Sequence, residues 1–500
     1  MKLEEIIKEC GFTRIDGDAG IEITNITSDS RKVTPGAMFI AVKGYAGDGH
    51  RFIASALEKG AAAIMYEDRQ ELEVQVNAYK ANGGNVEKTA FVEVKNSRHA
   101  EAMAAAAFYG NPSHELTLVG ITGTNGKTTT VTLLYNLFRG LGYHCGLLST
   151  IANYVGDKEI ETTNTTADPI TINALLRQMA DEGCEYCFME VSSIGMEQER
   201  VTGLKFKAGI FSNLTHDHLD YHKTFAEYLR CKKLFFDTLP ADAYAITNID
   251  DKNGMVKVQN TKAKVVTYSC RSMADHTCRI IEESFDGMQL RIDGQDIWTR
   301  LIGQHNAYNL LAIYVTATLV GAKPEEALIQ LSKLKSAKGR LETLRGPRGI
   351  SVAIDYAHTP DALENVLKTL RDIGPKSHII CLFGCGGDRD KTKRPEMAAV
   401  AEKYADRIFV TSDNSRTENT EDILEDIRKG FSREGLVKAL FIADRKEAIR
   451  TAITLAPDGA VILLAGKGHE TYQIIGTEHR HFDEREVVAE VFKSMEGDAK

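Results

Sequence analysis

One stretch of ten residues decides the fold of this chain, and it reads Gly120-Ile121-Thr122-Gly123-Thr124-Asn125-Gly126-Lys127-Thr128-Thr129. It follows the apolar run Leu116–Ile121, which predicts a buried strand, and it opens a helical run that extends to Phe138. Glycines in such a loop let successive backbone N–H groups turn toward a phosphate, and the helix N-terminus adds partial positive charge. The order of strand, loop and helix therefore predicts a site for a nucleoside triphosphate.

Two side chains of this loop have distinct expected roles. Lys127 should reach the β- and γ-phosphates, and the Thr128 hydroxyl should bind Mg²⁺. The backbone of the loop should surround the phosphates, so the predicted nucleotide-binding residues are Gly123, Thr124, Asn125, Gly126, Lys127, Thr128 and Thr129. A chance glycine-rich turn is the alternative, but it does not account for the flanking strand and helix. The loop does not predict which chemical group receives the phosphoryl group.

The charge of the chain speaks against a nucleic-acid partner. The 500 residues carry a net charge of −9, and the pI is near 5.9. Binding to nucleic acid by counterion release would need a basic face. Any phosphate-bearing ligand should instead be bound by loops, helix N-termini and single Arg or Lys side chains.

The sequence predicts a cytosolic protein without a membrane segment. The N-terminal residues Met1–Glu5 are acidic where a secretory signal would be basic, and no apolar run approaches the ~20 residues that span a bilayer. The nine cysteines are scattered and odd in number, which favours reduced thiols. Cys184 and Cys187 have redox spacing, but they lie in an apolar run that favours a buried strand.

The length predicts roughly three domains of ~150 residues each. A turn cluster at Tyr109–Ser113 suggests a first domain at residues 1–110, followed by a central domain at 111–335 and a C-terminal domain at 336–500. The fold class should be α/β, because strands alternate with helices and are almost wholly apolar, as in parallel sheets covered on both faces. The central strands are expected at Leu116–Ile121, Cys187–Val191, Gly209–Leu214 and Ala243–Asn248.

Strands of the C-terminal domain run directly into polar clusters. In open α/β sheets ligands bind beyond the carboxyl ends of the strands, so these clusters predict a binding site, although solvated loops could produce one or two of them. The clusters are Asp355–His358, Gly384–Arg389, Thr411–Asn414 and Gly466–Glu470.

Candidate metal ligands follow two central strands. Glu190 ends one strand, where a Mg²⁺ ligand would lie beside a phosphate loop, although an ordinary strand-end charge is the alternative. The segment His216–His222 contains three His and two Asp within seven residues. Because oxygen ligands and phosphate favour Mg²⁺, a zinc site is the weaker interpretation.

Lys232 occupies an unusual place in a predicted helix. The run Thr224–Phe236 has an apolar stripe that includes Phe225, and Lys232 lies on this stripe, whereas Lys233 points about 100° away. A lysine on a buried face is costly unless it is paired or deprotonated. A neutral amine could react with CO₂ to form a carbamate, which would supply an anionic oxygen. A lysine whose ammonium reaches solvent is the equally weighted alternative.

These motifs resemble the Mur ligase family, and the resemblance covers essentially the whole chain. The motifs that carry it are Asp29-Ser30-Arg31, Gly123–Thr129, Asn164-Thr165-Thr166, Glu190–Ser193, Gln198, Arg200, His216–Tyr221, Asn248, Asp250-Asp251, His305-Asn306, Gly339-Arg340, Asp355–Pro360, Gly384–Lys391, Asp413–Arg416 and Gly466–Glu470. The family commonly has His where this chain has Ile194, and Pro where it has Ser415. The second departure bears on a loop geometry that Pro would have restricted.

The resemblance implies a role for each group of residues. The uridine diphosphate end of a substrate would contact Ser28, Ser30, Tyr45, Ala46 and Gly47, and its muramoyl-dipeptide end would contact Asn164, Thr165, Thr166, Ser192, Gln198 and Arg200. ATP and two Mg²⁺ would be held by Lys127, Thr128, Glu190, His218 and carbamylated Lys232. Asn248, Asn306, Arg340 and Asp355 would lie near the nucleotide. The incoming amino acid would meet Arg389, Asp413, Asn414, Ser415, Arg416, Gly466 and Glu470.

The resemblance also implies a reaction. An ATP-dependent ligase of this kind activates a carboxylate as an acyl phosphate and adds the third amino acid to UDP-N-acetylmuramoyl-L-alanyl-D-glutamate in peptidoglycan precursor synthesis. Arg416 favours meso-diaminopimelate, because Arg can bind the extra carboxylate with both oxygens. The alternatives are L-lysine as the amino acid, a folylpolyglutamate synthetase-like ligase, and a phosphate-loop kinase or switch NTPase. We expect a monomer, with a small uridine-nucleotide domain, a central phosphate-loop domain and a Rossmann-like C-terminal domain.

Overall fold

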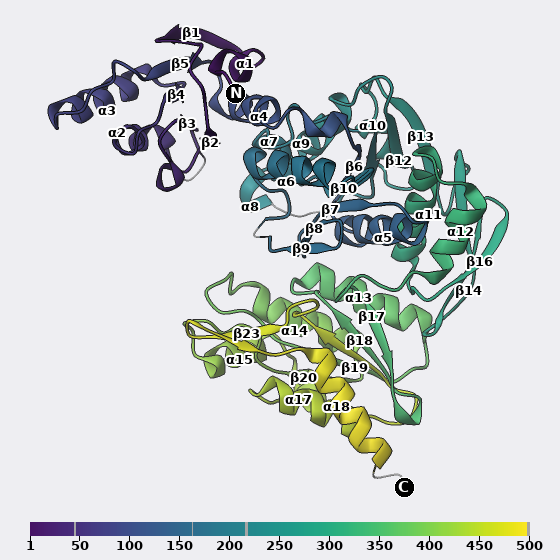
Figure 1. Cartoon of the computed structure of the whole chain (residues 1–500). Helices are drawn as coiled ribbons and strands as arrows, with labels where there is room; N and C mark the ends of the chain where they lie inside the picture. The colour runs from purple at the N-terminus through teal and green to yellow at the C-terminus, as the bar shows by residue number, and fades with distance from the viewer. Residues whose placement is uncertain (45–46, 163, 216–218, 498–500) are drawn as a thin grey trace. The chain divides into compact units, whose positions relative to one another are not determined.

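The computed structural model describes residues 1–44, 47–162, 164–215 and 219–497 (Figure 1). The chain divides into two compact units. One comprises Met1–His276 with Ala312–Ala327, and the other comprises Thr277–Leu311 with Leu328–Lys500.

The first unit begins with a five-stranded sheet. Its strands are β1 (Phe12–Asp16), β2 (Asn25–Thr27), β3 (Ala37–Ile40), β4 (Ala63–Tyr66) and β5 (Ala90–Val94), in the order β1-β5-β4-β3-β2. The pairs from β5 to β2 are parallel, and β1 pairs antiparallel with β5. The accompanying helices are α1 (Leu3–Ile7), α2 (Ile53–Glu58), α3 (Arg69–Ala81) and α4 (Ser97–Phe108). Two apolar clusters, one with Met38 and one with Phe39, form its core, since neighbouring residues of a strand face opposite sides.

The second sheet of this unit carries the phosphate loop. Its strands are β6 (Thr117–Thr122), β7 (Cys145–Leu148), β8 (Asn153–Val155), β9 (Lys158–Ile160), β10 (Tyr186–Glu190), β11 (Ala208–Phe211), β12 (Tyr244–Asn248) and β13 (Lys264–Ser269). From β13 through β12, β11, β6 and β10 to β7 the sheet is parallel, and β8 and β9 extend it antiparallel.

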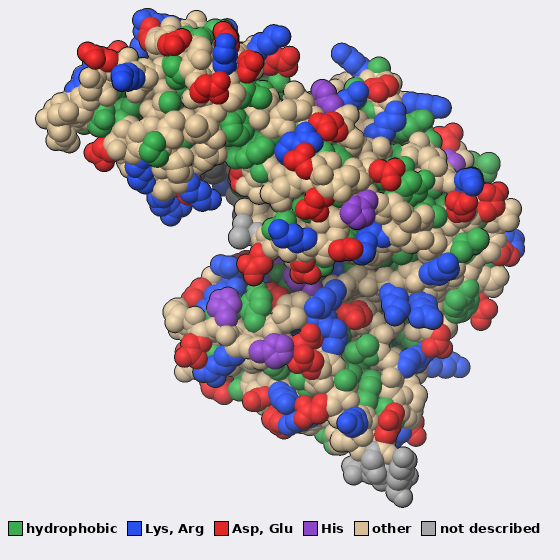
Figure 2. Space-filling model, in the orientation of Figure 1, with side chains coloured by type: hydrophobic (Ala, Val, Ile, Leu, Met, Phe, Trp, Pro, Cys, Tyr) green, Lys and Arg blue, Asp and Glu red, His purple; other side chains and the backbone are tan. Residues whose placement is uncertain are grey.

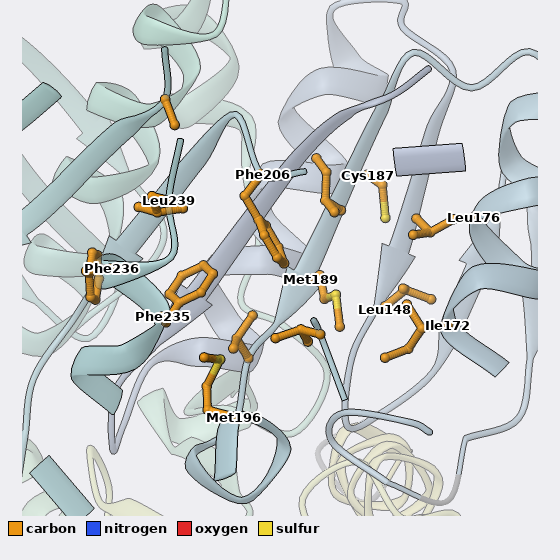
Figure 3. Packing of buried hydrophobic residues seen from close by; sticks show 14 of the residues in the cluster. Leu148, Ile172, Leu176, Cys187, Met189, Met196, Phe206, Phe235, Phe236 and Leu239 are labelled. Carbon is orange, nitrogen blue, oxygen red and sulfur yellow. The ribbon is translucent and has the colours of Figure 1, made fainter. Parts of the chain in front are cut away.

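Helices pack on this parallel sheet, as the continuous apolar strands predict. They are α5 (Lys127–Gly140), α6 (Pro169–Asp181), α7 (Ser193–Glu197), α8 (Leu219–His222), α9 (Phe225–Asp237) and α10 (Gly254–Lys257). Figure 3 shows side chains of the buried cluster, among them Met189 of β10, Leu176 of α6 and Phe206, which precedes β11. The β6 strand lies between β11 and β10, so the loop that follows it starts at the centre of the sheet.

The second unit contains an antiparallel meander of β14 (His276–Ser284), β15 (Gly287–Ile292) and β16 (Gln295–Thr299). The unit boundaries fall within helices α11 (Gln304–Leu319) and α12 (Pro324–Lys333).

A third sheet forms the rest of the second unit. Its strands are β17 (Glu342–Arg345), β18 (Ser351–Asp355), β19 (Ile379–Phe383), β20 (Arg407–Val410), β21 (Ala439–Phe441) and β22 (Val461–Ala465), in the order β17-β18-β22-β19-β20-β21. All pairs are parallel except β17 with β18. The helices are α13 (Pro360–Ile373), α14 (Lys393–Tyr404), α15 (Thr420–Arg428), α16 (Arg433–Lys438), α17 (Arg445–Thr454) and α18 (Glu484–Gly497), and β23 (Tyr472–Ile475) pairs with β24 (Glu478–His481) in a hairpin.

These sheets confirm the predicted α/β class and the parallel sheets of the central and C-terminal regions. The proposed boundaries near residues 110 and 335 stay predictions. In the described ranges no helix has the length and apolar character needed to cross a membrane. Acidic and basic side chains are interspersed over the face in Figure 2, in keeping with the modest net charge.

Candidate active site

The phosphate loop has the conformation that its glycines permit. Gly126 is the N-cap of α5 and has φ +89°, a left-handed value that favours glycine. At Gly123 an added Cβ would lie 1.9 Å from Ser212 Oγ, so a larger residue would displace its neighbour. The loop thus connects β6 to α5 with backbone N–H groups at the helix N-terminus, where an anion is favoured.

Side chains from adjacent strands and from α9 support the loop. Thr124 Oγ1 lies 3.0 Å from the Tyr228 hydroxyl, and Ser212 Oγ donates to the Asn125 carbonyl at 2.7 Å. Asn248, at the end of β12, donates to the Ser212 carbonyl at 2.8 Å. Asn248 therefore contacts the loop indirectly, through Ser212. This position agrees with its predicted place near the nucleotide.

Two lysines converge on one carbonyl of the loop. Lys127 Nζ donates to the Gly123 carbonyl at 2.9 Å, and Lys232 Nζ donates to the same oxygen at 2.7 Å. Lys232 is 1% exposed, and its ammonium lies 4.9 Å from the Tyr228 ring centroid. The helical stripe thus correctly predicted the buried face, and the alternative of an ammonium in solvent is wrong.

Glu190 ends β10 beside the loop, since it pairs with Ile121 of β6. It is 1% exposed, and its Oε1 accepts from the Thr150 backbone N–H at 2.8 Å. Among the residues that the structure describes, no donor reaches its buried Oε2. A buried carboxylate oxygen without a donor suits a cation, so Glu190 and the neighbouring Thr128 fit Mg²⁺.

The assignment of His218 as a metal ligand stays a prediction. His218 lies outside the described residues, as do Tyr45 and Ala46 of the predicted uridine site. Within the described residues, no group of three or more His, Cys, Asp and Glu side chains could hold a metal ion.

The residues predicted to bind the muramoyl-dipeptide form one network. Thr166 Oγ1 donates to the Glu190 carbonyl at 2.9 Å and accepts from the Ser192 N–H at 3.0 Å. Arg200 donates to the Thr166 carbonyl at 2.5 Å and to Gln198 Oε1 at 2.7 Å. The Thr165 hydroxyl accepts a hydrogen bond from the Thr150 hydroxyl at 3.1 Å, and Asn164 precedes Thr165 in the same loop.

The described residues of the predicted uridine site lie after β2 and β3. Ser30 begins the short 3-10 helix η1 (Ser30–Lys32), and its carbonyl accepts from Lys59 Nζ at 2.8 Å, while Gly47 is exposed. Ser28 interacts electrostatically with the Glu101 side chain. Asp29 caps η1 and pairs with Arg31, which lowers the pKa of Asp29 to about 2.

Glu101 was not predicted from the sequence, and it has an unusual environment. It lies on α4 and is 6% exposed. Burial raises its pKa to about 7, and Asp168 contributes in the same direction, while Ser28 and Arg200 oppose the rise. In the sequence, the only sign of this environment is that Glu101 is the one acidic residue of the Ala-rich helix α4.

The raised pKa of Glu101 predicts a pH-dependent stability. Because the folded pKa of about 7 exceeds the unfolded value, the folded state binds the extra proton, and stability falls as pH rises from about 4.5 to about 7. Glu101→Gln should remove this loss, which is about 3 kcal/mol by pH 8. Apparent unfolding free energies from urea titration at pH 5 and pH 8 would test this. An equal difference between variant and wild type at both pH values would contradict it.

The predicted amino-acid residues gather at the carboxyl ends of β19, β20 and β22. Asn414 Nδ2 donates to Glu470 Oε2 at 2.9 Å. Lys467 Nζ donates to Asn414 Oδ1 at 3.1 Å and lies 3.0 Å from Glu470 Oε2 and 3.5 Å from Asp413 Oδ1. A Cβ added at Gly466 would lie 3.2 Å from Asp413 Oδ2, so the loops that follow β22 and β20 meet beyond the end of β19. Lys467 is fully buried and was missed, although it lies within a recognised motif.

The loop that lacks the family's proline is fixed by the β23–β24 hairpin. Ser415 is buried, and Arg416 has φ +50°. The Arg416 N–H donates to the Ile474 carbonyl at 3.2 Å, and the Gly476 N–H donates to the Arg416 carbonyl at 2.8 Å. Backbone pairing with the hairpin therefore restrains the chain at Arg416, the residue after the position where the family commonly has proline.

The two predicted arginines border the same glycine. A Cβ added at Gly386 would lie 3.0 Å from Arg416 Nη1 and 3.8 Å from Arg389 Cγ. Arg416 Nη1 donates to the Gly387 carbonyl at 2.9 Å, and Arg389 is exposed. The structure thus brings both cations to the loop that follows β19.

Arg340 and Asp355 lie at the start of the third sheet. The Leu341 N–H donates to Asp355 Oδ2 at 2.7 Å, and the Arg340 guanidinium lies 5.1 Å from the Tyr356 ring centroid. Burial raises the pKa of Asp355, and Arg340 opposes this rise. Asn306 is buried in α11, where it donates to the Ile302 carbonyl at 2.7 Å.

Models of known families match three consecutive parts of the chain. Residues 22–109 match the Mur ligase family catalytic domain, residues 121–317 match the Mur ligase middle domain, and residues 339–468 match the Mur ligase glutamate ligase domain. A ligase from Phocaeicola vulgatus, the UDP-N-acetylmuramoyl-L-alanyl-D-glutamate--2,6-diaminopimelate ligase, is 50% identical over 493 residues, which cover 98% of this chain and 99% of the relative. The chain belongs to the Mur ligase family. The resemblance inferred from the motifs is confirmed.

Solved structures of Mur ligases agree with this assignment. A UDP-N-acetylmuramoyl-L-alanyl-D-glutamate--2,6-diaminopimelate ligase has a TM-score of 0.71 and 29% identity, with 99% of both chains covered. MurF from Acinetobacter baumannii has the same fold at 17% identity, with a TM-score of 0.62 and 98% of both chains covered. The chain therefore has the three-domain Mur ligase fold that the sequence predicted.

Proposed function

We propose that this chain is an ATP-dependent ligase that adds meso-diaminopimelate to UDP-N-acetylmuramoyl-L-alanyl-D-glutamate in peptidoglycan precursor synthesis. The observation that carries the proposal is the convergence of Lys127 and Lys232 on the phosphate loop, beside the buried carboxylate of Glu190. Relatives named for this reaction, which are 50% identical over nearly the whole chain, support the choice of substrates.

The reaction has two chemical steps. A carboxylate does not condense with an amine in water without activation, so the γ-phosphoryl group of ATP passes to the D-glutamyl γ-carboxylate and gives an acyl phosphate and ADP. The amine of the amino acid then attacks the acyl carbon, and the tetrahedral intermediate collapses to an amide and inorganic phosphate. Lys127 lowers the repulsion between the two anionic reactants in the first step.

Divalent cations fit the same place. Thr128, Glu190, His218 and a carbamylated Lys232 would hold two Mg²⁺, which would supply positive charge between the phosphates and the carboxylate. Asn248, Asn306, Arg340 and Asp355 would lie near the nucleotide. Ser28, Ser30, Tyr45, Ala46 and Gly47 would bind the uridine diphosphate, and Asn164, Thr165, Thr166, Ser192, Gln198 and Arg200 would bind the muramoyl-dipeptide.

The charges at the ends of β19, β20 and β22 support a zwitterionic side chain on the amino acid. Asp413 and Glu470 share the single cation of Lys467, which leaves one net negative charge for a distal ammonium. Arg416 and Arg389 offer positive charge for a distal carboxylate. Diaminopimelate has both groups at its distal end, whereas L-lysine has only the ammonium.

ADP release with purified protein would test the proposal. Wild-type protein should require both the nucleotide-sugar dipeptide and meso-diaminopimelate, and L-lysine should be a poor substitute. Arg416→Ala should raise the KM for diaminopimelate roughly thirty- to thousand-fold, since the lost charge-assisted contact is worth ~2–4 kcal/mol. The KM for ATP should be unchanged.

Each alternative predicts a different result. A switch NTPase would release ADP without either substrate, and a folylpolyglutamate synthetase-like enzyme would prefer a folate acceptor. Equal rates with L-lysine and diaminopimelate would show that Arg416 does not select the amino acid.

A further inference from the structure

The turn at Glu197–Arg200 has an unusual backbone. It follows α7, and Glu199 within it has φ +56°, a left-handed value that is uncommon for a residue other than glycine. Such a conformation persists only where surrounding contacts impose it. The neighbours of Glu199 are Gln198 and Arg200, both predicted to contact the muramoyl-dipeptide.

Helix α4 supplies those contacts from about 100 residues earlier in the chain. Asn96 Nδ2 donates to Glu199 Oε1 at 2.7 Å, and His99 Nδ1 lies 2.9 Å from Glu199 Oε2. Asn96 is also the N-cap of α4, because its Oδ1 accepts from the backbone N–H groups of Arg98 and His99 at 3.1 and 3.2 Å. Both oxygens of the Glu199 carboxylate are therefore bound by the start of one helix.

A second acidic side chain of the turn also faces α4. Glu197 Oε1 lies 3.8 Å from Arg98 Nη1, and Glu197 Oε2 accepts from the Tyr221 hydroxyl at 2.5 Å. The intervening Gln198 donates to the same hydroxyl at 3.0 Å. Residues 197 and 199 thus bind α4, while 198 and 200 belong to the network around Thr166.

One turn further along α4, Glu101 interacts electrostatically with Ser28, which is predicted to contact the uridine diphosphate. The buried Glu101 also interacts electrostatically with Arg200. A single helix therefore contacts residues predicted to bind both ends of the nucleotide-sugar dipeptide. The helix is anchored independently, since it packs against α1 and α6.

We propose that α4 is a positioning element for the nucleotide-sugar dipeptide, and that Glu199 is the positioning residue through which it orients Gln198 and Arg200. The inference rests on the proposed function, because it takes these two side chains as substrate contacts. Glu199 does not itself contact the substrate in this scheme.

Glu199→Gly provides the direct test. Glycine adopts φ +56° without strain, so the variant keeps the backbone accessible while it removes the carboxylate that α4 binds. The KM for the nucleotide-sugar dipeptide should rise about tenfold. The KM values for ATP and diaminopimelate, and kcat, should stay within twofold of wild type. Glu199→Gln keeps an acceptor for Asn96 and should recover part of the loss.

Three further variants test the same contact. His99→Ala should raise the same KM, and the double variant His99→Ala/Glu199→Gly should be no worse than the worse single variant, since Glu199→Gly already removes the contact with His99. Asn111→Gly is the matched control, because Asn111 is exposed, has φ +54° and lies outside the proposed contacts. It should leave all three KM values unchanged.

Hydrogen exchange of the free protein gives a readout that does not depend on the substrate. The amides of residues 198–201 should exchange faster in Glu199→Gly than in wild type. If wild-type protein neither binds nor uses the nucleotide-sugar dipeptide, the proposed function is wrong. Hydrogen exchange would then still test whether the contact between Glu199 and α4 restrains residues 198–201. A wild-type KM for the dipeptide in Glu199→Gly would overturn the inference. An equal rise in all three KM values with a lower unfolding midpoint would also overturn it, because it would indicate general destabilisation.

Discussion

Lys127→Ala should reduce ADP release by ~10²- to 10³-fold or more, because the substitution removes the cation that we propose for the transferred phosphoryl group. The Lys127 ammonium donates to the carbonyls of Gly123 and Thr124, both at 2.9 Å, so it lies against the loop itself. Its contribution should increase as negative charge develops on the β–γ bridging oxygen of the departing ADP. A coupled ADP-release assay with all three substrates would measure the effect.

The fold should survive this change, since Lys127 lies at the first position of α5, where alanine is well tolerated. Thermal unfolding of the variant should therefore match wild type to within a few degrees. Lys233→Ala is a suitable control, because Lys233 is the partly buried neighbour of Lys232 on α9 and pairs with Asp237 at 2.6 Å. Turnover of Lys127→Ala at the wild-type rate would refute the nucleotide site.

Lys232→Ala should be nearly inactive, with a loss of ~10²- to 10³-fold. Lys232 is buried beside the loop, and we propose that its amine carries a carbamate that serves as an anionic ligand for Mg²⁺. Small carboxylates could occupy the space left by the side chain and replace the carbamate. Formate or acetate should therefore restore part of the activity of Lys232→Ala, but none to Lys127→Ala.

The carbamate can be detected directly. Wild-type protein equilibrated with ¹³C-bicarbonate should show a carbamate carbon resonance that is absent from Lys232→Ala. An unmodified amine in the active, metal-loaded enzyme, together with no rescue by formate, would show that Lys232 acts only through its contact with Gly123. The loss of activity would then reflect the geometry of the loop.

Much of this protein could be predicted from local patterns. The phosphate loop was recognisable because strand, glycines and helix are consecutive, and their conformations depend on near neighbours. The burial of Lys232 followed from helical periodicity alone, since residues seven apart lie on one face. Polar residues at the ends of β18, β19, β20 and β22 indicated a site, because parallel strands end at one edge of a sheet.

Other features had no local signal. All four residues of β3 are buried, since β3 lies between β2 and β4 and is covered on both faces. Lys467 is a basic residue in a polar motif, and only the fold shows that its ammonium joins Asp413 to Glu470.

The sequence alone therefore predicted the glycine-rich loop between β6 and α5, the α/β class and the family, because each depends on short patterns in a fixed order. Only the tertiary structure showed which distant residues hold those patterns in place. Asn96 and His99 bind Glu199 across a separation of about 100 residues, and the β23–β24 hairpin restrains Arg416 where a proline is missing. Such contacts depend on how the chain packs. The periodicity of a segment does not predict which distant residue a side chain will contact.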